Sequence, residues 1–259
     1  MTLNTPVYEQ TRKAWRDIWI GTDFDRELRS LAYPRAQKVI SLYLKYLRKD
    51  EPLLEAGCGP GHIVYYLREQ GYQAIGLDYA PEALRATHAQ HPTVPLQVGD
   101  VHVLPYAENT FGGYLSFGVV EHFEHGPGPA LREAFRVLKP GGALVITVPH
   151  PQVVEALYKL KQRIVPATVP RAGYYERTYT HQELAAHVQN TGFSLAMVEP
   201  ISHSYTLYGL LPIFRKRGGY YETSRLAEQA GAVCRRLLPW PTAFETLIIA
   251  RKPINSPLP

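Results

Sequence analysis

The sequence is organised around one stretch, Leu53-Leu54-Glu55-Ala56-Gly57-Cys58-Gly59-Pro60-Gly61. An apolar run ends there in an acid, and three alternating glycines lead into a helical pattern that begins at Ile63. This order predicts a β-strand, a tight turn and an α-helix. Because Gly57 and Gly59 carry no Cβ, the backbone can turn with positive φ and a ligand can lie against it. The N–H groups at the start of the helix would face that ligand.

Two common nucleotide-binding patterns do not fit this stretch. The dinucleotide fingerprint has its third glycine three positions after the second, and a phosphate loop would continue with Lys-Ser or Lys-Thr, where His62-Ile63 stands here. The pattern E-x-G-x-G-x-G instead resembles the first motif of class I S-adenosylmethionine (SAM) dependent methyltransferases. In that family the acid and the glycine turn hold the methionine end of SAM. The resemblance gives this role to Glu55, Gly57, Cys58, Gly59 and Gly61.

Two more acids follow predicted strands at similar spacing. Gln73–Asp78 and Pro95–Asp100 each have the pattern of a short strand that ends in Asp. The carboxyl ends of parallel strands lie along one edge of a sheet, so Asp78 can accept hydrogen bonds from the ribose hydroxyls of a bound nucleoside. The resemblance implies that Asp100 accepts from the adenine amino group and that the backbone N–H of Val101 meets the ring. It also adds Tyr79 and Phe117 to the SAM site.

The fourth predicted strand is followed by candidate catalytic residues. Tyr114–Phe117 is expected as this strand, and Glu121-His122 stands where many family members carry an acid–His pair. The family usually has Asp after the Phe that opens the strand, but this chain has Gly112, so a carboxylate that braces the backbone is missing. Ubiquinone-pathway O-methyltransferases resemble this region but carry a further acid where this chain has Gly118. A metal site is therefore not expected.

The remaining elements complete an α/β pattern. Leu131–Leu138 is expected as a helix, Lys139-Pro140-Gly141-Gly142 as the turn that closes it, and Ala143–Val148 as a buried strand; this turn and strand also resemble the family. The capping box of Thr180 and Glu183 starts another helix. Further strands are expected over 194–199 and 243–252. The predicted fold is a Rossmann-like, doubly wound sheet of seven strands with the last strand antiparallel.

We expect a single methyltransferase domain over residues 1–259. Its SAM-binding core occupies 50–150, and residues 179–201 and 241–253 supply the rest of the sheet. Helices over 1–49 form an N-terminal cap, with a break at Gly21-Thr22-Asp23. N-terminal helices of the resembled family often fold over the SAM pocket, so the candidate lid residues are Trp15, Trp19, Tyr33 and Arg35, with Trp19 and Arg35 as SAM contacts. Two insertions, 151–178 and 202–240, leave the ligand-binding edge of the sheet and are expected to form the acceptor pocket and its lid.

The chemistry requires few catalytic groups. The methyl group of SAM is already electrophilic, so the enzyme aligns a nucleophile with it and excludes water. A general base assists when the acceptor is a hydroxyl. His122 is the first candidate because it lies just beyond strand four, with Glu121, His150 and His125 as the others. A structural role for His122 at a helix start is the alternative. For Cys58, a structural role as a small residue in the turn is favoured over a role as a reactive thiol.

Charge and composition indicate which classes of acceptor or partner the protein could bind. The chain carries a net charge of +5, and residues 151–259 hold 13 basic and 7 acidic residues against 15 and 16 in residues 1–150. Both insertions are rich in Tyr and in Lys or Arg, which suits an anionic or aromatic acceptor, an anionic membrane surface, RNA, or only a solvated surface. Two cysteines form no disulfide framework, no apolar run spans a membrane, and no signal pattern opens the chain. A cytoplasmic protein is expected.

These observations predict a SAM-dependent methyltransferase that transfers a methyl group by direct in-line displacement to oxygen or nitrogen of a small acceptor. SAM is the expected cofactor and S-adenosylhomocysteine its product. The sequence lacks the Asn/Asp-Pro-Pro-Tyr/Phe motif of amino-methylating DNA enzymes and the Pro-Cys nucleophile of cytosine-C5 enzymes. An RNA methyltransferase and a non-catalytic SAM-binding sensor or scaffold are the alternatives.

Overall fold

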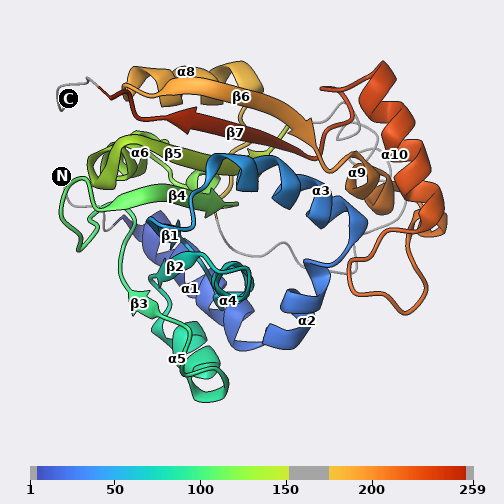
Figure 1. Cartoon of the computed structure of the whole chain (residues 1–259). Coiled ribbons are helices and arrows are strands. Elements are labelled where there is room, and N and C mark those ends of the chain that lie inside the picture. The colour runs from blue at the N-terminus through green and yellow to red at the C-terminus, as the bar shows by residue number, and fades with distance from the viewer. Residues whose placement is uncertain (1–4, 152–174, 255–259) are drawn as a thin grey trace.

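One mixed sheet forms the centre of the computed structural model, which describes residues 5–151 and 175–254 (Figure 1). The strands are β1 (Pro52–Ala56), β2 (Gln73–Asp78), β3 (Leu96–Val98), β4 (Phe111–Phe117), β5 (Leu138–Pro149), β6 (Ser194–Ile201) and β7 (Glu245–Arg251). Their order across the sheet is β3-β2-β1-β4-β5-β7-β6, and β7 runs antiparallel to both β5 and β6. This confirms the predicted seven-stranded Rossmann-like sheet with an antiparallel last strand.

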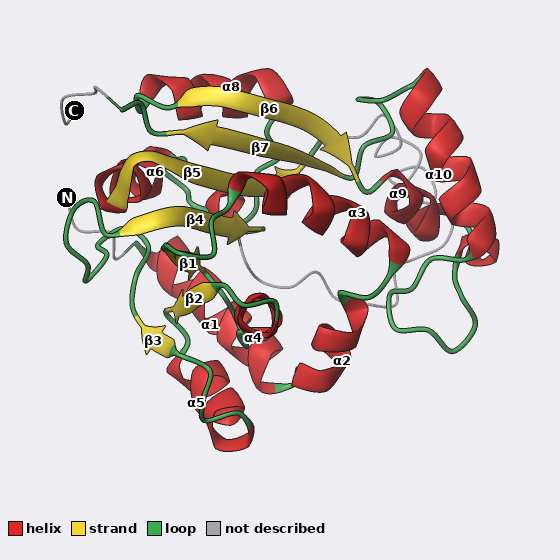
Figure 2. Cartoon of the chain, viewed as in Figure 1, coloured by secondary structure: helices red, strands yellow, loops and turns green. Residues whose placement is uncertain are grey.

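Helices cover both faces of the sheet (Figure 2). One face packs against α3 (Pro34–Tyr43), α4 (His62–Glu69) and α5 (Pro81–Gln90), and the other against α6 (Gly128–Val137) and α8 (His181–Asn190). Successive side chains of a strand point to opposite faces. In β5, Leu144 and Ile146 therefore join the core under α6 and α8, while Val145 joins the core under α3 and α4. Because both faces are buried, the central strands are mostly apolar.

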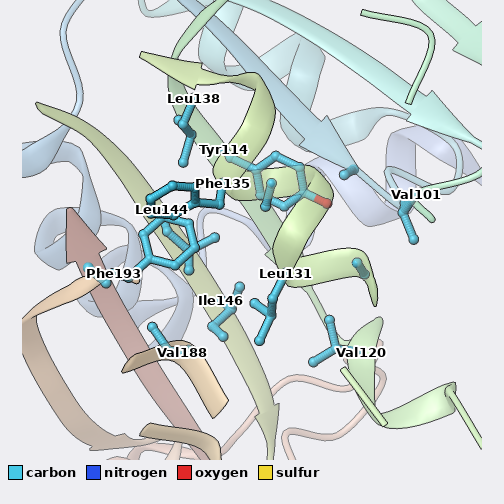
Figure 3. Close-up of a cluster of buried hydrophobic side chains, with 14 of the residues drawn as sticks. Val101, Tyr114, Val120, Leu131, Phe135, Leu138, Leu144, Ile146, Val188 and Phe193 are labelled. Atoms are coloured by element: carbon cyan, nitrogen blue, oxygen red, sulfur yellow. The ribbon is translucent and has the colours of Figure 1, made fainter. Parts of the chain in front are cut away.

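The core under α6 and α8 holds the sheet where β4 and β5 pair. Figure 3 shows Leu131 and Phe135 of α6 beside Leu144 and Ile146 of β5. The Phe135 and Phe193 rings meet edge to face at 5.0 Å between centroids. Full burial of each such side chain contributes roughly 1.5–3 kcal/mol. The strand ends that carry the predicted site therefore rest on a tightly packed support.

The N-terminal segment forms three helices, α1 (Pro6–Ile20), α2 (Phe24–Ser30) and α3, followed by a short 3-10 turn, η1 (Leu44–Tyr46). The predicted break after α1 is confirmed, and Asp23 caps α2 by accepting a hydrogen bond from the N–H of Arg26 at 3.0 Å. A second break precedes Pro34, which takes the first turn of α3, where its missing N–H is not needed. The second predicted helical segment is therefore two helices.

Two strand predictions differ from the structure. The predicted Lys139–Gly142 turn lies inside β5, because the β4–β5 register passes from Phe111↔Leu138 directly to Gly113↔Ala143. The four residues form an irregular bulge, with Gly141 at φ +81°. β3 is shorter than predicted, so Asp100 lies beyond the strand and pairs with Val103 in an isolated bridge.

The Gly112 position has a structural explanation. A Cβ built there would collide with the side chain of Glu51, whose carboxyl group lies near Lys139 at 3.9 Å. Glu51 therefore occupies the space that an Asp side chain at position 112 would need. The strand keeps its place without the family's carboxylate.

The insertion over 202–240 contains α9 (His203–Leu210), a 3-10 turn, η3 (Pro212–Phe214), and α10 (Arg225–Leu237). It follows the C-terminal end of β6, and the chain returns where Phe244 N–H donates to the Ile201 carbonyl at 3.1 Å. Most of the other predicted insertion, residues 152–174, lies outside the described residues. None of the helices that the structure describes is long and apolar enough to cross a membrane.

Candidate functional site

The glycine turn between β1 and α4 is held by the next strand. The N–H groups of Gly57 and Cys58 both donate to the Leu77 carbonyl, at 2.8 and 3.1 Å. Gly57 and Gly59 adopt φ of +80° and +53°. A Cβ at Gly57 would lie 2.5 Å from Val119 Cγ2, and one at Gly59 would lie 2.8 Å from Trp19 Cζ2. Backbone conformation and close neighbours both require glycine at these two positions.

Asp78, at the end of β2, holds the glycine turn through a hydrogen bond to its backbone. Its Oδ2 accepts from the Gly59 N–H at 2.8 Å and its Oδ1 from the Ala80 N–H at 2.9 Å. Burial raises the pKa of this carboxyl, although backbone hydrogen bonds from Ala80, Gly59 and Tyr79 oppose the shift. Each carboxylate oxygen has two lone pairs, so the side chain can hold the turn and still accept ribose hydroxyls.

Glu55 is the buried acid at the end of β1. Its side chain is 3% exposed, and its Oε2 atom has no hydrogen-bond partner among the described residues. Burial and the neighbouring charge of Asp78 raise its pKa well above the ordinary value. A buried polar atom without a partner is unfavourable, so Oε2 is available to a donor such as the amino group of a bound amino acid.

A cavity of about 200 Å³ opens over the glycine turn. Residues from α1, from the ends of β1, β2 and β4, and from the short turn η2 (Val120–His122) with its next residue line it. They are Tyr8, Thr11, Arg12, Trp15, Trp19, Gly57, Asp78, Tyr79, Phe117, Gly118, Val119, His122 and Phe123. The cavity thus brings together six of the predicted site residues: Trp19, Gly57, Asp78, Tyr79, Phe117 and His122.

Helix α1 forms one wall of this cavity. Trp15 stacks on Trp19 at 5.4 Å between ring centroids, and Trp15 also meets the His122 ring edge to face at 5.1 Å. The Arg12 guanidinium lies 5.9 Å from the centre of the Tyr79 ring. Sequence reasoning found the two tryptophans as lid candidates but missed Tyr8, Thr11 and Arg12. The one feature of the sequence that could have indicated these three residues is that they lie on the same predicted helix as the tryptophans.

Asp100 is not among the residues that line the cavity, and its carboxylate is hydrogen-bonded to Tyr8 and His102. Its Oδ2 accepts from the Tyr8 hydroxyl at 2.6 Å, and its Oδ1 accepts from the His102 backbone N–H at 2.9 Å and contacts His102 Nδ1 at 2.8 Å. Burial works to raise the pKa of Asp100, but the hydrogen bonds from His102 and Tyr8 outweigh it and lower the pKa to about 2. Asp100 is therefore a carboxylate that ties α1 to the loop after β3. Val101 follows it as a buried core residue.

His122 lines the cavity from the turn after β4. Its Nδ1 lies 2.7 Å from the Tyr175 carbonyl oxygen, which can only accept, so Nδ1 carries the proton. In the neutral ring Nε2 then holds the lone pair. Burial lowers the pKa of His122, although the Tyr175 hydrogen bond opposes the shift. The imidazole is therefore neutral at pH 7 and chemically able to take up a proton.

Glu121 lies beside His122 and is almost completely buried. Its Oε1 is 3.5 Å from the position that a Cβ on Gly118 would take, and its Oε2 has no partner among the described residues. Burial, with Glu176 and Glu245 as neighbouring acids, raises the pKa of Glu121 to about 8. This carboxyl is protonated at pH 7 and sits directly behind a residue that lines the cavity.

His150 and Cys58 have other surroundings. His150 Nδ1 contacts the Thr246 hydroxyl at 3.0 Å, and its ring packs near His181 and Trp240. His150 is not among the residues that line the cavity. The Cys58 thiol is buried against Gly76, and burial raises its pKa well above the ordinary value. The thiol therefore packs the turn rather than presenting a nucleophile.

Arg35 lines a different cavity, of about 190 Å³, between α3, the end of β6 and α10. Its guanidinium lies 4.4 Å from the centre of the Tyr205 ring, and its charge acts on the buried Glu245. The structure thus brings Arg35 to the insertion over 202–240 and not to the glycine turn. Among the residues described, no group of three or more His, Cys, Asp or Glu side chains is arranged to hold a metal ion.

Comparison with known proteins agrees with this geometry. A family model described as a methyltransferase domain matches residues 54–146. A Mycolicibacterium smegmatis protein named a probable S-adenosylmethionine-dependent methyltransferase is 29% identical over 116 residues, 45% of either chain. The ubiquinone/menaquinone biosynthesis C-methyltransferase UbiE of Roseobacter denitrificans is 34% identical over 132 residues, 46% of this chain and 52% of that protein. The chain spans about half the length of the curated relatives it matches.

The solved structures show the fold over a larger share of the chain. A chain from the complex between the Haloferax volcanii Trm112 methyltransferase activator and a methyltransferase has a TM-score of 0.63 and is 17% identical. That match covers 92% of this chain and 97% of the other. The domain matched in sequence contains the glycine turn, Asp78 and the end of β4 that surround the cavity. Residues 54–146 therefore match the methyltransferase domain family, and most of the chain shares the fold of the solved methyltransferase chain.

Proposed function

We propose that this protein transfers a methyl group from SAM to an oxygen or nitrogen atom of a small acceptor molecule. The observation that carries the proposal is the cavity over Gly57, because it is lined both by Asp78 at the glycine turn and by the neutral His122. SAM, when bound, supplies an electrophilic methyl group on a sulfonium sulfur. The chain's own residues then have to bind the donor, orient the acceptor and exclude water.

The donor side of the cavity suits SAM in three respects. Gly57 lines the cavity without a side chain of its own, and Glu55 offers a buried carboxyl oxygen that has no hydrogen-bond donor among the described residues. Asp78 offers further lone pairs at the end of β2. We assign the methionine end of SAM to the turn (Glu55, Gly57, Cys58, Gly59, Gly61), the ribose to Asp78 and Tyr79, and the adenine to Asp100 and Val101, with Trp19 and Phe117 as apolar contacts.

The acceptor side is built from His122 and Glu121. A hydroxyl acceptor transfers its proton to His122 Nε2 while its oxygen attacks the methyl group. The Tyr175 carbonyl, which accepts a hydrogen bond from Nδ1, stabilises the imidazolium ion that results. Glu121, protonated at pH 7, can donate one hydrogen bond toward the acceptor from behind Gly118. Both residues lie on the short segment after β4, so the same backbone turn positions them.

The experiment is a transfer assay with methyl-labelled SAM, a fractionated metabolite extract and total RNA as parallel acceptors. Label in a small-molecule product supports the proposal, and its loss in His122→Ala assigns the base. The exposed His88 on α5 provides a matched control as His88→Ala. Label in RNA, with binding that falls steeply with salt, would favour the RNA alternative. Calorimetric binding of SAM without any labelled product would indicate a non-catalytic SAM-binding protein.

A further inference from the structure

Helix α10 carries exposed apolar side chains on one side. Leu226, Val233 and Leu237 are 45%, 56% and 69% exposed, and their spacing of seven and four residues aligns them on one stripe of the helix. The other side of α10 is buried against α9, where a Cβ on Gly231 would lie 2.7 Å from the Ser204 nitrogen. The stripe is therefore separate from the side by which α10 packs on the protein.

The preceding 3-10 turn η3 extends this apolar surface. Leu211 and Ile213 are 53% and 63% exposed. Ser224, the N-cap residue of α10, fixes η3 beside the helix, because its hydroxyl donates to the Ile213 carbonyl at 3.0 Å and its N–H to the Phe214 carbonyl at 2.9 Å. We call these five side chains the insertion patch: Leu211, Ile213, Leu226, Val233 and Leu237.

Positive charge borders the insertion patch. The exposed basic residues of this insertion near the patch are Arg215, Lys216 and Arg217 after η3, and Arg225 and Arg236 on α10. Arg235 lies on the other side of α10 and pairs with Glu199 at 3.8 Å. Residues 202–240 contain two acids, Glu222 and Glu228. Glu222 pairs with Lys216, and Glu228 pairs with Lys38 at 3.2 Å and accepts from Thr223, with both carboxyl side chains less than one-fifth exposed. The outer face of the insertion is therefore apolar and cationic.

We propose that the insertion patch and its arginines dock this protein onto a membrane that contains anionic phospholipid. A helix with large apolar side chains beside arginines lies in the plane of the bilayer interface, with its apolar stripe below the headgroups. Each arginine near the surface is attracted by the negative potential of anionic headgroups. RNA would use the arginines but leave the leucines in water, and a second copy on the same patch would bring like charges together.

The location of the patch agrees with an outward-facing role. α10 lies at the rim of the molecule beyond α9 (Figure 1). The insertion follows the C-terminal end of β6, and the cavity over the glycine turn lies at the same edge of the sheet. Docking through α10 would therefore leave the sheet and its N-terminal edge facing water.

The test is co-sedimentation of the full chain with vesicles of phosphatidylcholine alone and of phosphatidylcholine with phosphatidylglycerol. We expect binding to the phosphatidylglycerol vesicles, weakened by salt. The pair Val233→Glu and Leu237→Glu should lower the partition coefficient at least tenfold. Arg225→Gln and Arg236→Gln should each lower it about fivefold. The control Ile254→Glu makes the same kind of change at a 77% exposed position near the C-terminus and should leave binding unchanged.

Several results would overturn the proposal. These are absence of binding to either vesicle, equal binding to both vesicle types, or loss of binding in Ile254→Glu to the same extent as in the patch variants. A concentration-dependent dimer that the patch variants abolish, without vesicle binding, would make the patch a self-association surface. The arginine variants keep the test decisive if the glutamate pair unfolds, and a urea midpoint for each variant shows that it is folded. Methyl transfer is not measured, so the outcome is independent of the proposed activity.

Discussion

Gly57→Ala tests whether the close approach of Val119 defines the glycine turn. Residue 57 adopts φ +80°, and a Cβ there would lie 2.5 Å and 3.1 Å from the two Val119 methyl groups. The left-handed conformation is unfavourable by about 1–2 kcal/mol for a residue with a Cβ. Forcing the methyl group against Val119 adds roughly 1–3 kcal/mol. We therefore expect Gly57→Ala to lower the free energy of unfolding by roughly 2–5 kcal/mol.

The two contributions can be separated. Gly218 has φ +70° and nothing within 4 Å of a built Cβ, so Gly218→Ala should show the backbone contribution alone, about 1–2 kcal/mol. Val119→Ala in the Gly57→Ala background removes the two colliding methyl groups. The double variant should recover roughly 1–3 kcal/mol relative to the sum of the single variants, which is a coupling energy measurable in a double-mutant cycle.

The assay is urea denaturation of the four proteins in the cycle and of Gly218→Ala, with the m-value checked for constancy. Calorimetry with SAM follows, because Gly57 and Val119 both line the cavity. SAM affinity should fall in Gly57→Ala. The reasoning is refuted if Gly57→Ala is no more destabilising than Gly218→Ala, or if Val119→Ala recovers nothing.

Three further predictions follow from buried groups. His122→Ala should lower turnover of a hydroxyl acceptor by about 10²–10⁴-fold with nearly unchanged calorimetric SAM affinity, because the acceptor's proton needs the base; an unchanged rate would assign His122 a structural role. Burial raises the pKa of Glu121 from 4.5 to about 8, so the folded protein keeps a proton that the unfolded chain loses, and the free energy of unfolding falls as pH rises between 4.5 and 8. In urea titrations at several pH values, Glu121→Gln should reduce the pH dependence of the free energy of unfolding by up to about 1.4 kcal/mol per pH unit. An unaltered pH dependence would contradict the raised pKa of Glu121. Lys252 Nζ donates hydrogen bonds to Asn109 Oδ1 and to the Phe135 and Leu138 carbonyls at 2.8–2.9 Å. Lys252→Met should therefore lower the free energy of unfolding, measured by urea denaturation, by roughly 2–5 kcal/mol. A loss below about 1 kcal/mol would show that these hydrogen bonds contribute little to stability.

Local sequence patterns were enough to predict the elements of the sheet. The alternation of apolar residues, the glycine turn, the Thr180–Glu183 capping box and the acids at the ends of β1 and β2 each depend on neighbours a few residues apart. These patterns identified Gly57 and Asp78 before any tertiary contact was known. The same local reasoning placed the Lys139–Gly142 segment in a turn, because it could not show that β4 would pair with residues on both sides of it.

Contacts between distant segments decide how the site is completed. Tyr8 reaches Asp100 across 92 positions, Trp19 packs on Gly59, and Arg35 lies at another cavity with Tyr205. Glu51 fills the space beside Gly112, although no spacing rule connects the two residues. Hydrophobic periodicity specifies which face of an element is buried, but the partner on that face depends on how whole elements pack. The sequence therefore predicts the turn and the acids of the proposed SAM site, whereas the position of α1 over the cavity and the chemical state of Glu121 and His122 depend on tertiary packing and burial.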